Sequence, residues 1–336
     1  MVTTQYKKIT STGRLPRGIA VLVIIIFYVC STQAGRFAAG PVKLIIYPSE
    51  LPVSGKKYRL LPEVEELADA DAVPLYEKAV QSLPDNLKMD EINQWLKTPP
   101  DKLPRKQVQS TLEKFKPAFR FLEQAAKCKQ CDWPYLDDDT LSQTLANYRK
   151  LLFLLALQAR LQIAQDSYDE AISTMQTVFG MARHFGEDPI LVRGLVGIGM
   201  AAYMCRQIEQ FVQRPDAPNL YQALRDLPQP LVDLTKQAEW EEPDLKGKVH
   251  MLMNRLDRHV ATLQCVEAIR LYAGSHDGMF PGKLLDVKEV DIPDDPVTTK
   301  PFSYNLSGSA AILEAPGSED LEGKYAIRYE LHLGQR

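Results

Sequence analysis

A chain of 336 residues that is 45% hydrophobic and 25% charged has the composition of a globular protein, which excludes an intrinsically disordered chain. The net charge is −3, but residues 1–40 carry five cations and no acid, so the rest carries −3 − 5 = −8. A mildly acidic body lacks the basic surface of a general nucleic-acid binder, and we therefore expect no nucleic-acid partner.

An apolar segment follows the basic N-terminus. It runs unbroken from Gly18 to Cys30 and, with four mild residues, reaches Ala34. The cations before it predict a single-pass anchor in a bacterial inner membrane, with residues 1–17 in the cytoplasm and the body exported. A cleaved signal peptide is the alternative, since Thr32 and Ala34 are small residues before a candidate cut. That alternative leaves a periplasmic or secreted body.

Residues 35–70 read as a linker with one strand candidate, VKLIIY at residues 42–47. Helical patterns follow and define a helical body over residues 71–244. Within it, residues 105–127 predict one helix with a kink at Pro117.

Three consecutive helices form the centre of the predicted body, over residues 140–214. The first opens with Thr140 and Gln143, at the spacing of a capping box. The stretch around Leu152 and Leu155 is apolar on every side, so we expect both residues to be buried at a helix–helix contact.

The next two helices have equally clear predicted ends. Ser167 and Glu170 repeat the capping-box spacing at the start of the second helix. Gly186 suits the left-handed residue after that helix. Asp188 then caps the third helix, with Pro189 in its first turn.

The turn at residues 166–171 resembles that of a tetratricopeptide hairpin, in which small and aromatic residues let two antiparallel helices approach closely. The match is partial, because Asp166 stands where the repeat usually has glycine. A single hairpin is first a way of packing two helices. A peptide-binding groove is the alternative, although arrays usually need about three or more repeats.

Short helices are expected at residues 220–227 and 231–240, and a long helix at residues 245–273. This long helix opens a C-terminal unit, residues 245–336, in which glycines and prolines separate three strand candidates at residues 302–305, 310–314 and 325–333. The predicted fold class is mainly α. It combines antiparallel helical hairpins, tetratricopeptide-like in part, with a long helix that leads into a small antiparallel β-sheet packed on it.

Of the five cysteines, Cys128 and Cys131 are close enough in sequence to close a small disulfide ring in an exported body. A redox or metal site is the alternative, although the thioredoxin-like context and a second pair of ligands are both missing. Cys205 and Cys265 lie in helical patterns and read as small buried hydrophobes. Cys30 belongs to the apolar segment.

Gly197, Gly199 and Ala202 have the spacing of a dinucleotide fingerprint, but they lie inside a helix with no strand before them. We interpret them as small residues that let a neighbouring helix pack closely. The sequence holds no phosphate loop, nucleophile elbow or HExxH motif, so no catalytic, cofactor-binding or metal-binding residue is assigned.

Two weaker constellations lie near the tail. One loop carries four carboxylates, at Asp286, Asp291, Asp294 and Asp295. They are calcium ligands in one interpretation and ordinary turn residues in the other. An enzyme would need a site assembled from dispersed residues, for which His276, Asp294 and Glu241 are the candidates.

Several stretches carry a resemblance to known proteins. They are CDW at 131–133, APNLYQAL at 217–224, LPQPL at 227–231, AIRLYA at 268–273 and DPVTTKPFSY at 295–304. Together they resemble a family of uncharacterised, membrane-anchored bacterial proteins, which implies no activity. The tail is also similar, more weakly, to type II secretion major pseudopilins, in which a long helix leads through a Gly-x-x-Pro turn into a small sheet. The N-terminus departs from the pseudopilin pattern, because its apolar run lacks the early Glu.

The anchor, the hairpin-like helices and the lack of a catalytic constellation favour a membrane-tethered envelope protein that serves interaction or scaffolding. We expect the membrane, through Gly18 to Ala34, and an unidentified protein as partners, and no cofactor. The alternatives are an envelope hydrolase with a dispersed site and an accessory component of a secretion or pilin-like system.

Overall fold

The computed structural model describes residues 40–52, 58–84, 86–239, 241–315 and 326–334. The predicted anchor from Gly18 to Ala34 lies outside these ranges. Within them, no helix combines the length and the apolar character needed to cross a bilayer.

The part of the chain predicted as a linker contains regular structure. The strand candidate at residues 42–47 is confirmed, and a 3₁₀ helix and a second strand follow it before residue 72. A helix then follows where the helical patterns begin, near residue 71, and a second one comes after it. The elements are β1 (Val42–Ile46), η2 (Val64–Glu66), β2 (Ala68–Asp71), α3 (Val73–Gln81), α4 (Met89–Lys97) and η3 (Pro100–Lys102).

The predicted helix over residues 105–127 is two helices, α5 (Arg105–Glu113) and α6 (Lys116–Ala126). Pro117 lies in the first turn of α6, where its missing N–H costs no hydrogen bond. The predicted kink is therefore wrong, because this proline begins a helix instead of bending one. The strand β3 (Cys128–Gln130) follows and pairs in parallel with β2.

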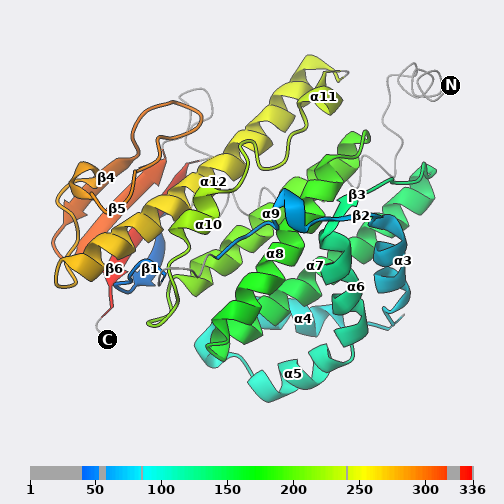
Figure 1. Ribbon diagram of the computed structural model, residues 1–336, viewed down its shortest axis with the longest axis horizontal. Coiled ribbons are helices and arrows are strands. Elements are labelled where there is room, and N and C mark those ends of the chain that lie inside the picture. Colours follow the sequence, from blue (N-terminus) through cyan, green and yellow to red (C-terminus); the bar gives the residue numbers. More distant parts are fainter. Residues whose placement is uncertain (1–39, 53–57, 85, 240, 316–325, 335–336) are drawn as a thin grey trace.

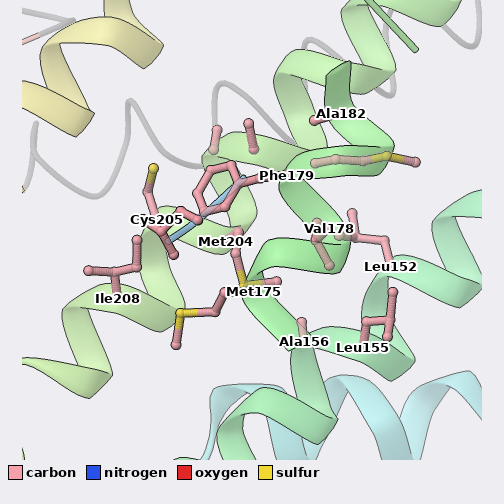
Figure 2. Close-up of a cluster of buried hydrophobic side chains, with 14 of the residues drawn as sticks. Leu152, Leu155, Ala156, Met175, Val178, Phe179, Ala182, Met204, Cys205 and Ile208 are labelled. Carbon is pink, nitrogen blue, oxygen red and sulfur yellow. The ribbon is translucent and has the colours of Figure 1, made fainter. Parts of the chain in front are cut away.

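Three long helices form the centre of the body, as the apolar periodicity predicts: α7 (Asp138–Ala164), α8 (Tyr168–Gly186) and α9 (Leu191–Phe211). Leu152 and Leu155 are 6% and 2% exposed. They lie in one apolar cluster with side chains of α8 and α9 (Figure 2), which confirms their burial at a helix contact.

The N-terminal caps of α7 and α8 only partly follow the prediction. The cap of α7 is Asp137, whose carboxylate accepts a hydrogen bond from the Thr140 N–H at 2.9 Å. The capping box assigned to Thr140 and Gln143 is therefore wrong by one turn. Ser167 is the N-cap of α8 as predicted, but its side chain makes no capping hydrogen bond.

Asp188 and Gly186 also have roles other than the predicted ones. Helix α9 begins at Leu191, and the buried Asp188 carboxylate binds the Arg193 guanidinium at 2.6 Å. Gly186 is the last residue of α8, and a Cβ there would lie 2.7 Å from a methyl carbon of Val232. Asp188 also accepts from the Ile190 N–H at 2.6 Å, just before α9, so its contacts are local, whereas Gly186 takes its role from a tertiary contact that a local pattern does not contain.

The small residues of α9 are confirmed as a packing feature at Gly197. A Cβ at this position would lie 2.7 Å from the carbonyl oxygen of Ala182 in α8, so only glycine permits the approach of the two helices. At Gly199 a Cβ would meet no atom within 4 Å.

The turn between α7 and α8 places Asp166 in the left-handed region, with φ at 58°. Glycine is the residue that favours this conformation, and Asp is among those that tolerate it. The two helices pack against each other as a hairpin. Its tetratricopeptide character stays a prediction.

The chain then forms α10 (Tyr221–Arg225), α11 (Thr235–Ala238), α12 (Pro243–Ser275) and η4 (Leu284–Asp286). The first two are shorter than predicted, and both lie close to prolines. The predicted long helix is confirmed: α12 has 33 residues, so it is about 50 Å long at the usual rise per residue.

Four strands form the C-terminal sheet in the order β1-β6-β5-β4. Strands β4 (Ser303–Ser307), β5 (Ala310–Ala315) and β6 (Ile327–Leu333) pair antiparallel, as predicted. The prediction of a purely antiparallel sheet is nevertheless wrong, because β1 pairs with β6 in parallel, with Val42 opposite Tyr329. The helices of the described residues all lie between these two strands in sequence and supply the long crossover that a parallel pair requires.

The sheet packs on α12, α12 packs on α9, and α9 packs on α7 and α8. Figure 1 shows the sheet at one end of the molecule and helices α3 to α6 at the other. One connected cluster of buried side chains includes Leu152 of α7, Leu263 of α12 and Tyr329 of β6. The helical body and the C-terminal unit therefore share a core.

Candidate functional site

A cleft of about 400 Å³ opens on the outer face of α8. Its opposite wall is the segment from Tyr58 to Glu66, which we call the strap. Lys127, after the end of α6, completes the lining. The lining residues are Tyr58, Arg59, Pro62, Glu66, Lys127, Asp169, Ile172, Ser173 and Gln176.

The α8 wall of the cleft is a single helical stripe. Asp169, Ile172, Ser173 and Gln176 lie at steps of three and four, which places them on one face of the helix. Ile172 is 5% exposed and forms an apolar floor. From Asp169 to Gln176 the stripe extends about 10 Å at the helical rise per residue.

The strap is held by charge pairs and by the backbone. The Arg59 guanidinium donates to the Glu66 carboxylate at 2.9 Å and also pairs with Glu63. The second oxygen of Glu66 accepts from the Glu63 N–H at 3.1 Å. The N–H of Ala68 donates to the carbonyl of Lys127 at 2.8 Å, which fixes the end of the strap beside α6.

Lys127 lies toward the far end of the stripe from Asp169. Helix α6 ends in close contact with α8 at Gly180, where a Cβ would lie 2.8 Å from that of Ala126. The next residue, Lys127, is therefore near the Gln176 end. Within the described part of the chain, the side chains of Lys127, Ser173 and Gln176 form no hydrogen bond or ion pair.

Cys128 begins strand β3, directly after the cleft residue Lys127, and Cys131 follows the end of that strand. Cys128 and Cys131 are both free thiols. Three steps of extended strand separate their Cα atoms by about 10 Å, whereas a disulfide needs less than about 7 Å. The predicted ring is thus not formed. Burial raises the pKa of both thiols, which opposes the thiolate that redox chemistry requires.

A buried histidine contacts this strand. His184 lies 2.8 Å from the Tyr76 hydroxyl through Nδ1 and 3.0 Å from the Cys128 carbonyl through Nε2. The neutral tautomer with its proton on Nε2 accepts from Tyr76 and donates to Cys128. The Arg183 guanidinium lies 2.8 Å from the same Nε2 and donates to the same Cys128 carbonyl. Burial, with the Arg183 charge beside it, lowers the pKa of His184 to about 4.

A second polar network, unforeseen in the sequence, joins the sheet to the helices. His259 of α12 lies 3.1 Å from the Glu209 carboxylate of α9 and 2.9 Å from the Tyr329 hydroxyl of β6. The Tyr329 hydroxyl donates to the same carboxylate at 2.7 Å. All three side chains are buried. They fasten three elements together in the packed interior, away from the cleft.

The dispersed enzyme site predicted near the tail is not assembled. Glu241 precedes α12 and His276 follows it, so the two lie about 50 Å apart along the helix. His276 stacks on Tyr272 and lies 3.4 Å from Glu289. Asp294 belongs to a β-bridge with Pro301.

The acidic loop has turn roles in the structure. The Asp295 carboxylate binds the Arg258 guanidinium through both oxygens, at 2.8 and 2.6 Å, and caps the N–H of Val297 at 3.0 Å. Among the described residues, no group of three His, Cys, Asp or Glu side chains gathers in a way that could hold a metal ion.

Comparison of the chain with protein-family models, curated proteins and solved structures finds no match in any of the three. The resemblances to membrane-anchored proteins and to pseudopilins stay predictions.

The cleft residues could not have been singled out from the sequence. The α8 stripe of three polar residues and one isoleucine reads as an ordinary solvated helix face. Only the fold brings the strap and Lys127 to it.

Proposed function

We propose that this chain is a membrane-tethered interaction protein, anchored through Gly18 to Ala34, whose helical body binds a segment of a protein partner in the cleft. The chemistry of the cleft carries the proposal. An apolar floor at Ile172 lies beside the side chains of Lys127, Ser173 and Gln176, which have no partner among the described residues. The cleft volume of about 400 Å³ falls in the usual range for binding sites, roughly 300–1,000 Å³.

The placement of the titratable groups supports binding over catalysis. A general acid or base must reach the reacting group through a hydrogen bond. His184 and His259 instead contact buried partners in the interior, Tyr76 and Glu209 among them. In the cleft itself, Lys127 and Asp169 line opposite ends.

Site-specific photo-crosslinking in the native envelope tests the proposal. A benzophenone amino acid replaces Ser173, on the exposed stripe, in the full-length chain. Ser303, exposed on β4 of the C-terminal sheet, is the matched control position. We expect a discrete protein adduct from position 173 that position 303 does not give. Identical adducts from both positions, or none from position 173, would overturn the proposal.

The tether is tested separately with reporters fused after Arg336. Export of the body predicts activity from a reporter that needs the periplasm and none from one that needs the cytoplasm. A C-terminal fusion that fluoresces as a cytosolic protein would contradict the topology.

A further inference from the structure

We infer that the cleft selects a segment with a carboxylate side chain, which pairs with Lys127. The inference rests on the proposed function, since it names the chemistry of the partner at the same site. It follows from a count of donors and acceptors and from the length of the cleft.

The acidic strap residue is already satisfied. Both oxygens of Glu66 are engaged, one by the Arg59 guanidinium and the other by the N–H of Glu63. The ammonium group of Lys127 therefore has no counterion among the residues that the structure describes, although Glu66 also lines the cleft.

The unused polar atoms are mostly donors. Lys127 brings an ammonium group, Gln176 an amide NH₂ and Ser173 a hydroxyl. The Arg59 Nε–H is buried and has no acceptor within the described ranges of the chain. A surplus of donors beside one uncompensated cation calls for an acceptor with one negative charge, and a carboxylate supplies two acceptor oxygens.

A phosphate group fits this lining less well than a carboxylate. Glu66 and Asp169 also line the cleft, and their carboxylates would repel the second charge of a dianion. Lys127 offsets one negative charge, which a carboxylate brings and a dianion exceeds.

The length of the stripe sets the size of the bound segment. The distance of about 10 Å from Asp169 to Gln176 accommodates about three residues of extended chain at about 3.3 Å each. The acidic residue then lies at the Gln176 end, where Lys127 is placed by the close contact of Ala126 with Gly180.

The probe is acetyl-Ala-Glu-Ala-amide, compared with its Gln and Lys counterparts. Each peptide is titrated into the full chain in lipid nanodiscs and followed by saturation-transfer NMR. We expect the Glu peptide to bind about two- to fivefold more tightly than the Gln peptide, the range of one exposed ion pair. The preference should weaken at high salt, which screens exposed charges. The Lys peptide should bind most weakly.

Variants separate the role of Lys127 from a general effect of charge. Lys127→Met keeps the stem and removes the ammonium, so it should abolish the preference for Glu over Gln. Lys127→Arg should retain it. Lys129→Met is the control, because Lys129 is also exposed and carries the same charge two residues away. Circular dichroism melting of each variant verifies that it folds.

Equal binding of the Glu and Gln peptides, or a preference that survives Lys127→Met, would overturn the inference. These outcomes leave the crosslinking result at Ser173 unaffected, so a partner without acidic preference would be recognised as such. A Glu preference that also disappears in Lys129→Met would assign it to the general field of the surface and would equally reject the pairing.

Discussion

Gly197 and Gly199 are two glycines of one helix in unlike surroundings. A methyl group at position 197 would overlap the Ala182 carbonyl, whereas at position 199 it would meet open space. We expect Gly197→Ala to destabilise the protein by about 1–3 kcal/mol through overpacking. Gly199→Ala should be neutral or stabilising by up to about 1 kcal/mol, because alanine is the better helix former. Chemical denaturation measures both, and equal effects would refute the contact.

Leu155 lies at the centre of the core, where the test removes side-chain atoms instead of adding a methyl group. This side chain is 2% exposed, between α7 and its neighbours. Leu155→Ala should lower the free energy of unfolding by about 2–5 kcal/mol, because the removed methyl groups leave a cavity. A loss below about 1 kcal/mol would show that the site collapses to fill the space.

His184 predicts a loss of stability in acid. Burial lowers the pKa of His184 from 6.5 to about 4. Because the folded pKa is below the unfolded one, the unfolded chain takes up the proton first. The contribution of His184 to the free energy of unfolding is complete above pH 6.5 and is lost as the pH falls toward 4. It amounts to roughly 3 kcal/mol, at about 1.4 kcal/mol for each pH unit.

A second buried group has the opposite effect on stability to His184 in the same pH range. Burial raises the pKa of Asp257 from 3.8 to about 6, so acidification through this range favours the folded state at that residue. The pH dependence of His184 is therefore measured in an Asp257→Asn background. Unfolding free energies between pH 4 and 7 are compared with those of the same chain carrying His184→Gln. A difference that stays constant with pH would contradict the shifted pKa.

At the scale of elements, the sequence predicts what is local and periodic. The apolar spacing located α7, α8, α9 and α12, and the glycines and prolines of the tail marked off β4, β5 and β6. Caps and breaks were less accurate, because Asp137, Pro117 and Gly186 take their roles from neighbours a few residues away or across a helix contact.

Helix α12 shows why buried polar groups were missed. Arg258, His259, Glu267 and Arg270 are charged or titratable residues that a helical pattern assigns to a solvated face, yet all are buried. Each of these side chains has a hydrogen-bonding or ion-pair partner that is distant in sequence or one turn away, such as Asp295 for Arg258. The α8 cleft was missed for a related reason, since its walls come from three separate segments.

At the scale of the whole molecule, the sheet is part of the core. Tyr329 of β6 contacts both Glu209 and His259, and β5 and β6 pack on α12. Deleting residues 302–336 should therefore expose one face of α12 and lower the melting temperature of the remaining body. An unchanged melting temperature in a calorimetric scan would mean that the sheet is an independent appendage.

The pairing of β1 with β6 has a consequence for synthesis. Val42 lies opposite Tyr329, which follows 329 − 42 = 287 residues later. A nascent chain emerging from the ribosome or a translocation channel holds β1 long before its partner strand exists. Until β6 arrives, β1 presents an unpaired edge, which is a template for wrong pairing. Closing so long a loop is entropically costly and slow. The last strand made is thus the one that closes the fold, and premature termination before β6 should yield chains that chaperones and proteases recognise.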